Sequence, residues 1–167
     1  SFQKFKNKQN YQILNETKTL HQKNSQFSKV QIKEFSILFI MLNFPKIVLK
    51  KIEDISKIIF LSEKNEGLKK IIINSLLEGD NREKIQSKIS ADYKKLIEEI
   101  QENSSIQIIV KVKNDEEILE LLSELLIELE ELNNLKKIES LEKELINNLD
   151  ENSYSELIKL KSQVNRE

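Results

Sequence analysis

The chain has 167 residues and a formal net charge of -1, and 38% of its residues are hydrophobic. This length is sufficient for one domain with a hydrophobic core, whereas a charge close to zero provides no overall field that would attract nucleic acid. No cysteine is present, which excludes disulfides, thiolate metal sites and a cysteine nucleophile, and fits a reducing compartment such as the cytoplasm. The two glycines are too few for the glycine patterns that bind nucleotides. No apolar stretch approaches the roughly 20 residues of a membrane span, so no membrane association is expected.

Residues 1–28 are predicted to form a flexible basic linker, because they are rich in Lys, Gln, Asn and Ser and show no sustained hydrophobic period. Lysines interleaved with aromatic residues can bind single strands, but a solvated tether is the simpler interpretation, so we expect weak or no nucleic acid binding. His21, the sole histidine, lies in this segment, and therefore no histidine-based catalytic centre or metal site is expected. Because the chain starts at Ser1 and its only methionine is Met41, we expect it to be the tail of a larger protein.

A helical bundle is predicted for residues 29–131. Its first helix should begin near Lys29, end at Asn43 and be buried on nearly all sides, because residues 37–42 are all apolar. Further helices are expected at 46–52 after Pro45, at 62–77 before Gly79, from a cap formed by Asp80 and Glu83 to Ile89, and from Ser90 to about Glu102.

One segment of the bundle has the alternation of a strand, at Ile106, Ile108, Val110 and Val112. No second strand is available to pair with it, and an isolated strand is not stable. These residues are therefore predicted to form an extended connection that packs on the bundle.

A very long amphipathic helix is predicted to follow. Asn114 and Glu117 have the spacing of a capping box, and apolar residues then recur at intervals of three and four from Ile118 to Leu149. At 1.5 Å per residue this helix would be a rod of about 50 Å. The apolar stripe is wide up to Leu129 and narrows beyond Leu132, so the helix should start in the bundle core and end outside it.

A second, shorter helix is predicted at the C-terminus. Asp150, Glu151 and Asn152 break the apolar pattern, and Ser153 with Glu156 has the spacing of another capping box. The short helix should fold back antiparallel on the narrow stripe, giving a C-terminal helical hairpin over residues 132–167. The predicted fold class is therefore all-α, with a helical bundle followed by this long hairpin.

Five residues are predicted to hold the hairpin closed across its seam: Leu145, Leu149, Tyr154, Leu157 and Leu160. Ile146 and Ile158 each lie about 100° away from that seam, so they should remain partly exposed. We expect these two isoleucines to contact a protein partner, because exposed apolar residues on a projecting hairpin can anchor in a groove.

The first half of the long helix, from Asp115 to Glu131, contains eight acidic residues and no basic one. Such a run can meet a basic partner or bind hard cations, but a solvated helix face with acids at its N-terminus is the favoured interpretation. No catalytic, cofactor-binding or metal-binding residues are expected, and no small-molecule substrate.

The order of these parts resembles the C-terminal helicase-binding region of bacterial DnaG-type primases. The resemblance spans residues 29–167 and rests on Leu-Asn-Phe-Pro at 42–45, Leu-Glu-Lys-Glu-Leu at 141–145 and Tyr-Ser-Glu-Leu-Ile-Lys-Leu-Lys-Ser-Gln at 154–163. In that family this region follows the zinc-binding and polymerase domains and binds the N-terminal domains of the hexameric replicative helicase. The resemblance implies a non-catalytic docking domain whose contact surface is the hairpin. The parent chain would be a nucleotidyltransferase.

Two other classes remain open: a helical domain of the helicase N-terminal type, and a generic coiled-coil scaffold or adaptor that forms oligomers through Ile118 to Leu149. A helical enzyme is the least expected, because it would need a buried acid or base with a shifted pKa, and no internal charged position suggests one.

Overall fold

The computed structural model describes residues 27–104, 106–107, 109–147 and 151–164. All regular elements of this described part are helices, which confirms the all-α fold class. In chain order they are α2 (Lys29–Asn43), α3 (Pro45–Leu49), α4 (Ile52–Lys57), α5 (Glu63–Leu77), α6 (Arg82–Lys88), η1 (Ala91–Tyr93), α7 (Lys94–Asn103), η2 (Val110–Val112), α8 (Asp115–Asn147) and α9 (Glu151–Val164). The linker predicted for residues 1–28 lies outside this part, except for its last two residues.

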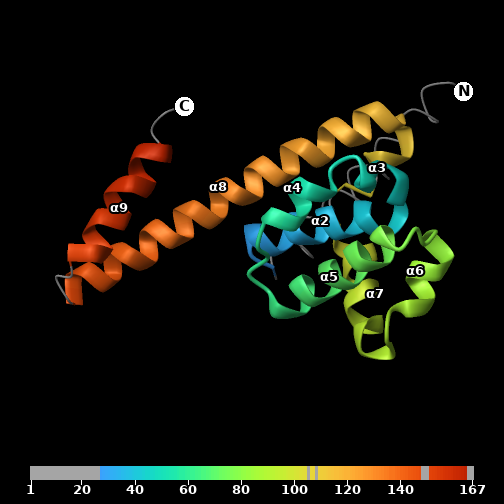
Figure 1. The fold of residues 1–167 in the computed structure, drawn as a ribbon, viewed down its shortest axis with the longest axis horizontal. Coiled ribbons are helices and arrows are strands. Elements are labelled where there is room, and N and C mark those ends of the chain that lie inside the picture. The colour runs from blue at the N-terminus through green and yellow to red at the C-terminus, as the bar shows by residue number, and fades with distance from the viewer. Residues whose placement is uncertain (1–26, 105, 108, 148–150, 165–167) are drawn as a thin grey trace, which may run out of the picture.

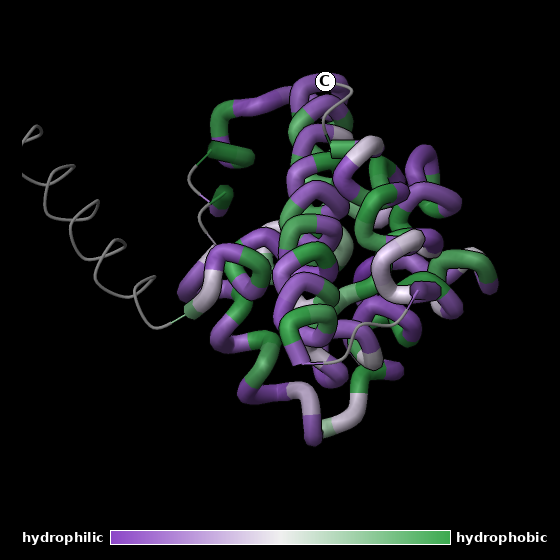
Figure 2. Tube along the Cα trace, turned by 90° about the vertical axis from the view of Figure 1, so that its left-hand side faces the viewer, coloured by the Kyte–Doolittle hydropathy of each residue, from purple (hydrophilic) through white to green (hydrophobic). Residues whose placement is uncertain are grey.

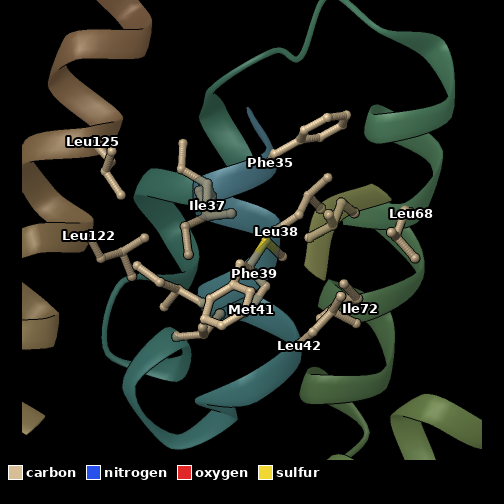
Figure 3. Close-up of a cluster of buried hydrophobic side chains, with 14 of the residues drawn as sticks. Phe35, Ile37, Leu38, Phe39, Met41, Leu42, Leu68, Ile72, Leu122 and Leu125 are labelled. Carbon is tan, nitrogen blue, oxygen red and sulfur yellow. The ribbon is translucent and has the colours of Figure 1, made fainter. Parts of the chain in front are cut away.

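Helix α2 is the central element of the bundle (Figure 1). Ser28 and Gln31 cap its start reciprocally, and all residues from Glu34 to Leu42 are buried. Leu122 and Leu125 of α8 approach α2 on one side, and Leu68 and Ile72 of α5 lie on the other (Figure 3). α2 also contacts α3, α6 and α7, so its nearly continuous apolar sequence is covered by helices all round, as expected.

The segment after Pro45 differs from the prediction. Pro45 occupies the first turn of α3, but this helix ends at Leu49, and the separate helix α4 follows. Of the six residues of α4 only Ile55 is buried, so α4 leaves almost no periodic signal in the sequence.

The end of α5 agrees with the prediction that Gly79 stops it. Gly79 has φ of 79°, its N–H donates to the Leu76 carbonyl oxygen (3.0 Å), and the Asp80 N–H donates to the Ser75 carbonyl oxygen (3.0 Å). This pair of bonds is a Schellman motif, in which the left-handed residue is most often glycine.

Two of the predicted helix caps were wrong. The cap of α6 is Asn81, whose side chain accepts from the Lys84 N–H, whereas Asp80 forms a salt bridge with Lys88. Ser90 makes no side-chain cap, and the chain first forms the 3-10 turn η1 before α7 begins.

The connection before α8 is helical and not extended. The Val110 N–H donates to the Ile106 carbonyl oxygen (2.9 Å), and η2 follows. Ile106 and Val110 are buried together, because residues four apart share one side of a helical turn, while Val112 is 85% exposed. Residue 108 lies outside the described part.

Helix α8 starts as predicted, with Asn114 and Glu117 forming a capping box. The Asn114 N–H donates to Glu117 Oε2 (2.9 Å), and the Glu117 N–H donates to Asn114 Oδ1 (3.0 Å). Its 33 residues pack along α2 and then extend beyond the bundle (Figure 1). Hydrophobic and hydrophilic segments alternate along the helices, as amphipathic packing requires (Figure 2).

Helix α9 starts earlier than predicted. Glu151 and Asn152, expected to form a break, are already helical, and Ser153 is an internal residue of α9 and not its cap. Asp150 and Leu149 lie outside the described residues.

Candidate functional site

The C-terminal part of α8 leaves the bundle core after Leu132, which is partly buried against that core. Buried residues of α8 run from Ile118 to Leu129, and the next buried one is Leu141, which packs against α9. α9 lies beside this distal end of α8, away from the bundle (Figure 1). The two helices therefore present a surface that no other helix of the described chain covers.

The contact between α8 and α9 is centred on Leu141 and Leu157, which are 8% and 7% exposed. Leu145 and Leu160, two of the predicted seam residues, are half-buried beside them. Tyr154 is 55% exposed, so it does not close the pair as expected. Leu149 lies outside the described residues.

Two ion pairs flank this contact. Lys161 Nζ lies 2.6 Å from Glu142 Oε1, and Lys137 Nζ lies 2.5 Å from Glu156 Oε1. Because all four side chains are about half exposed, each pair contributes little to stability but favours one arrangement of the two helices.

Ile146 and Ile158 are exposed, at 84% and 51%. On α8, Ile146 lies about 40° from Glu142, and on α9, Ile158 lies about 60° from Lys161. Since Glu142 and Lys161 are paired, we infer that Ile158 lies on the side of the α8–α9 pair that carries this salt bridge. Tyr154 belongs to the same side, because it lies about 20° from Lys161. Ile158 and Tyr154 thus lie on the salt-bridge side of α9, and Ile146 is exposed on α8 beyond Glu142, about 140° around the helix from Leu141.

A buried acid was missed in the sequence. Glu34 is fully buried, with Oε1 accepting from the Leu61 N–H (2.5 Å) and Oε2 accepting from Asn65 Nδ2 (2.6 Å). Burial raises the pKa of Glu34, although these hydrogen bonds oppose the rise. The expectation that no internal charged residue has a shifted pKa was therefore wrong. The sequence signal for this buried acid was a glutamate inside the most apolar helix of the chain.

A lysine of α5 is buried as well. Lys69 is 2% exposed, donates to the Ile58 carbonyl oxygen, and lies 2.8 Å from Glu66 Oε2 and 4.9 Å from the centre of the Phe60 ring. Burial acts to raise the pKa of Glu66, but the Lys69 ammonium and the Phe60 N–H together lower it below its usual value.

These charged groups hold the segment between α4 and α5. Glu34, Glu66 and Lys69 bind backbone atoms of residues 58, 60 and 61, and Asn133 of α8 donates to the Ile59 carbonyl oxygen (2.9 Å). Each charge is thus used to fix a loop that has no regular structure. Since Glu34 has no solvent-accessible surface, the arrangement serves structure and offers no place for a substrate.

The raised pKa of Glu34 predicts a pH dependence of stability. A carboxyl whose pKa is higher in the folded state binds protons more readily there, so its contribution to the free energy of unfolding is greatest below its ordinary value of 4.5. This contribution should be lost as the pH rises through the folded-state pKa. Urea unfolding of the wild type and Glu34→Gln across this range should show the wild type losing stability relative to the variant. An unchanged difference at all pH values would contradict the burial of an ionisable Glu34.

A groove of about 840 Å³ lies between α4, residues 58–61 and the middle of α8. Leu126 and Ile127 of α8 line one wall, and Ile59 and Leu61 line the other. The sequence did not reveal this groove, because its walls come from segments about 70 residues apart.

A metal centre and a membrane span find no support in the described part of the chain. It contains no group of three or more His, Asp or Glu residues arranged to hold a metal ion. Of the acidic run on α8, Glu117 pairs with Lys113, and Glu128 pairs with Lys33. None of the described helices is both long and apolar enough to cross a membrane. His21 lies outside the described residues.

No family model, curated protein or solved structure matches this chain.

Proposed function

We propose that this chain is a non-catalytic docking module, the C-terminal helicase-binding part of a bacterial replicative DNA primase, which acts in the cytoplasm. The proposal rests on the resemblance of its sequence to that family and on one structural observation. Ile146 and Ile158 are both exposed, and they belong to the α8–α9 pair, at the end of α8 that lies away from the bundle.

The partner in this proposal is the N-terminal domain of the hexameric replicative helicase. An amphipathic helix pair that presents a few apolar anchors suits a groove between partner helices. Tyr154 adds an aromatic ring to this surface, and aromatic residues are enriched among the residues that dominate binding energy.

The alternative of a generic coiled-coil scaffold is less favoured, because of the contact between α8 and α9. Leu141 of α8 and Leu157 of α9 are both buried where the two helices of one chain contact each other. The distal apolar stripe of α8 is therefore already covered by α9. A coiled coil with another chain through this stripe would have to displace α9.

Alanine substitutions should show which exposed apolar residues contribute to helicase affinity. Ile146→Ala and Ile158→Ala are each expected to weaken helicase binding by about 2 kcal/mol, or roughly 30-fold in Kd, because a true anchor loses its burial in the partner. Isothermal titration calorimetry with the helicase N-terminal domain measures this change. Val112→Ala is the matched control, since Val112 is 85% exposed but lies before α8 begins, at its bundle end.

Circular dichroism should show the same helicity for all three variants, because none of the three side chains is buried. Unchanged helicase affinity in both isoleucine variants would exclude this surface as the docking site.

A further inference from the structure

The groove between α4 and α8 has an apolar interior and a basic rim. Ile59, Leu61 and Ile127 line it and are 68%, 50% and 55% exposed. Burying such large apolar side chains under a partner would be favourable. Its charged lining consists of four lysines and two acids, Lys51, Lys57, Lys136, Lys137, Asp54 and Glu130. Neither Lys57 nor Lys136 forms a salt bridge with any described residue.

The neighbouring face of α8 has the opposite charge. Glu120, Glu124 and Glu131 are exposed, and they lie within about 40° of one another around the helix. Leu135, 51% exposed, continues this face, which we call the acidic ridge. None of its three glutamates forms a salt bridge within the described chain.

The acidic ridge lies beside the wall of the groove that α8 forms. The ridge is about 100° from Glu130 around α8, and Glu130 lies in the groove wall. Ile127 lies between the two directions and lines the edge of the groove. One surface of the molecule therefore carries a basic apolar groove and, next to it, an acidic apolar ridge.

We propose that the groove receives the acidic ridge of a second copy of this chain. In this dimer the two α8 helices run parallel, and the twofold axis lies between them, along their direction. The ridge of each copy then faces the groove of the other copy, and the two Ile127 side chains lie between the two contacts. A twofold interface must be complementary to itself, and this surface meets that requirement in both charge and apolarity. The interface uses the middle of α8, so it is independent of the docking function proposed for the distal Ile146 and Ile158.

Charge reversal on either side tests the pairing. Lys57→Glu/Lys136→Glu makes the groove acidic, and Glu124→Lys/Glu131→Lys makes the ridge basic. Each variant alone opposes like charges at both contacts of a dimer, so dimerisation of the full chain should weaken about tenfold or more. An equimolar mixture should restore the dimer, because an acidic groove then meets a basic ridge and a basic groove meets an acidic ridge.

Sedimentation equilibrium over a range of protein concentrations measures the dimer, and circular dichroism verifies that the variants are folded. Glu83→Lys/Lys94→Glu is the control, since both residues are exposed on α6 and α7, outside the groove and the ridge. Ile127→Ser should weaken the dimer, and Ile146→Ser should not. A wild-type chain that stays monomeric at all concentrations would overturn the proposal, as would folded charge variants that fail to pair when mixed. In either case the groove belongs to a different occupant.

Discussion

Glu34→Ala is expected to lower the free energy of unfolding by about 3 kcal/mol. The substitution removes the acceptor of the Leu61 N–H and of Asn65 Nδ2, in a place where no solvent reaches the side chain. Relief from burying a carboxyl group offsets part of this loss, but the unpaired donors and the cavity remain. Urea unfolding followed by circular dichroism measures the change.

Glu34→Gln is the matched control. Its side-chain carbonyl can still accept from the Leu61 N–H, and its amide can donate to Asn65 Oδ1, which is buried without a partner in the wild type, once the Asn65 amide turns over. The glutamine variant should therefore lose less than about 1 kcal/mol. If alanine and glutamine are equally tolerated, Glu34 does not hold residues 58–62.

Leu122→Ala should have an effect of similar size, lowering the free energy of unfolding by about 3 kcal/mol. Leu122 is 0% exposed and packs from α8 towards α2, so its truncation leaves a cavity between the long helix and the centre of the bundle (Figure 3). Thermal or urea unfolding of the full chain measures this loss.

Leu135→Ala is the control on the same helix. Because Leu135 is 51% exposed, its truncation should cost less than about 1 kcal/mol. Equal losses at the two positions would mean that the proximal half of α8 is not part of the core.

Helices with a strong local signal were predictable from the sequence. The capping box of Asn114 and Glu117 and the stop at Gly79 depend on residues within one turn, and the structure contains both. α4 was not predicted as a separate helix, because Ile55 is its one buried residue and a single apolar position gives no periodic pattern. The pattern at Ile106 and Val110 was misread because a spacing of four fits both a strand face and a helical turn.

The polar interior was not predictable in the same way. Glu34 binds the Leu61 N–H and Lys69 binds the Ile58 carbonyl oxygen, and these atoms come close only after α2 and α5 have packed. Sequence spacing does not encode such long-range partners, so a charge in an apolar helix was the only signal.

The exposed distal residues were partly predictable. Ile146 and Ile158 are exposed as a rotation of 100° from the seam implies. Tyr154 lies about 60° from Leu157 on the side of Ile158, and half-buried Leu160 lies as far to the other side, so helical geometry alone does not predict which of the two is exposed.

The most direct test of the docking function compares the full chain with one that lacks residues 151–167, by calorimetric titration with the helicase N-terminal domain. Circular dichroism first establishes that the shortened chain keeps the helicity of α2 to α8. The full chain is then expected to bind, and the shortened chain is expected to show no measurable binding, because Ile158 and the contact that orients Ile146 are gone. Equal affinity of the two chains would show that the α8–α9 pair is not the docking surface.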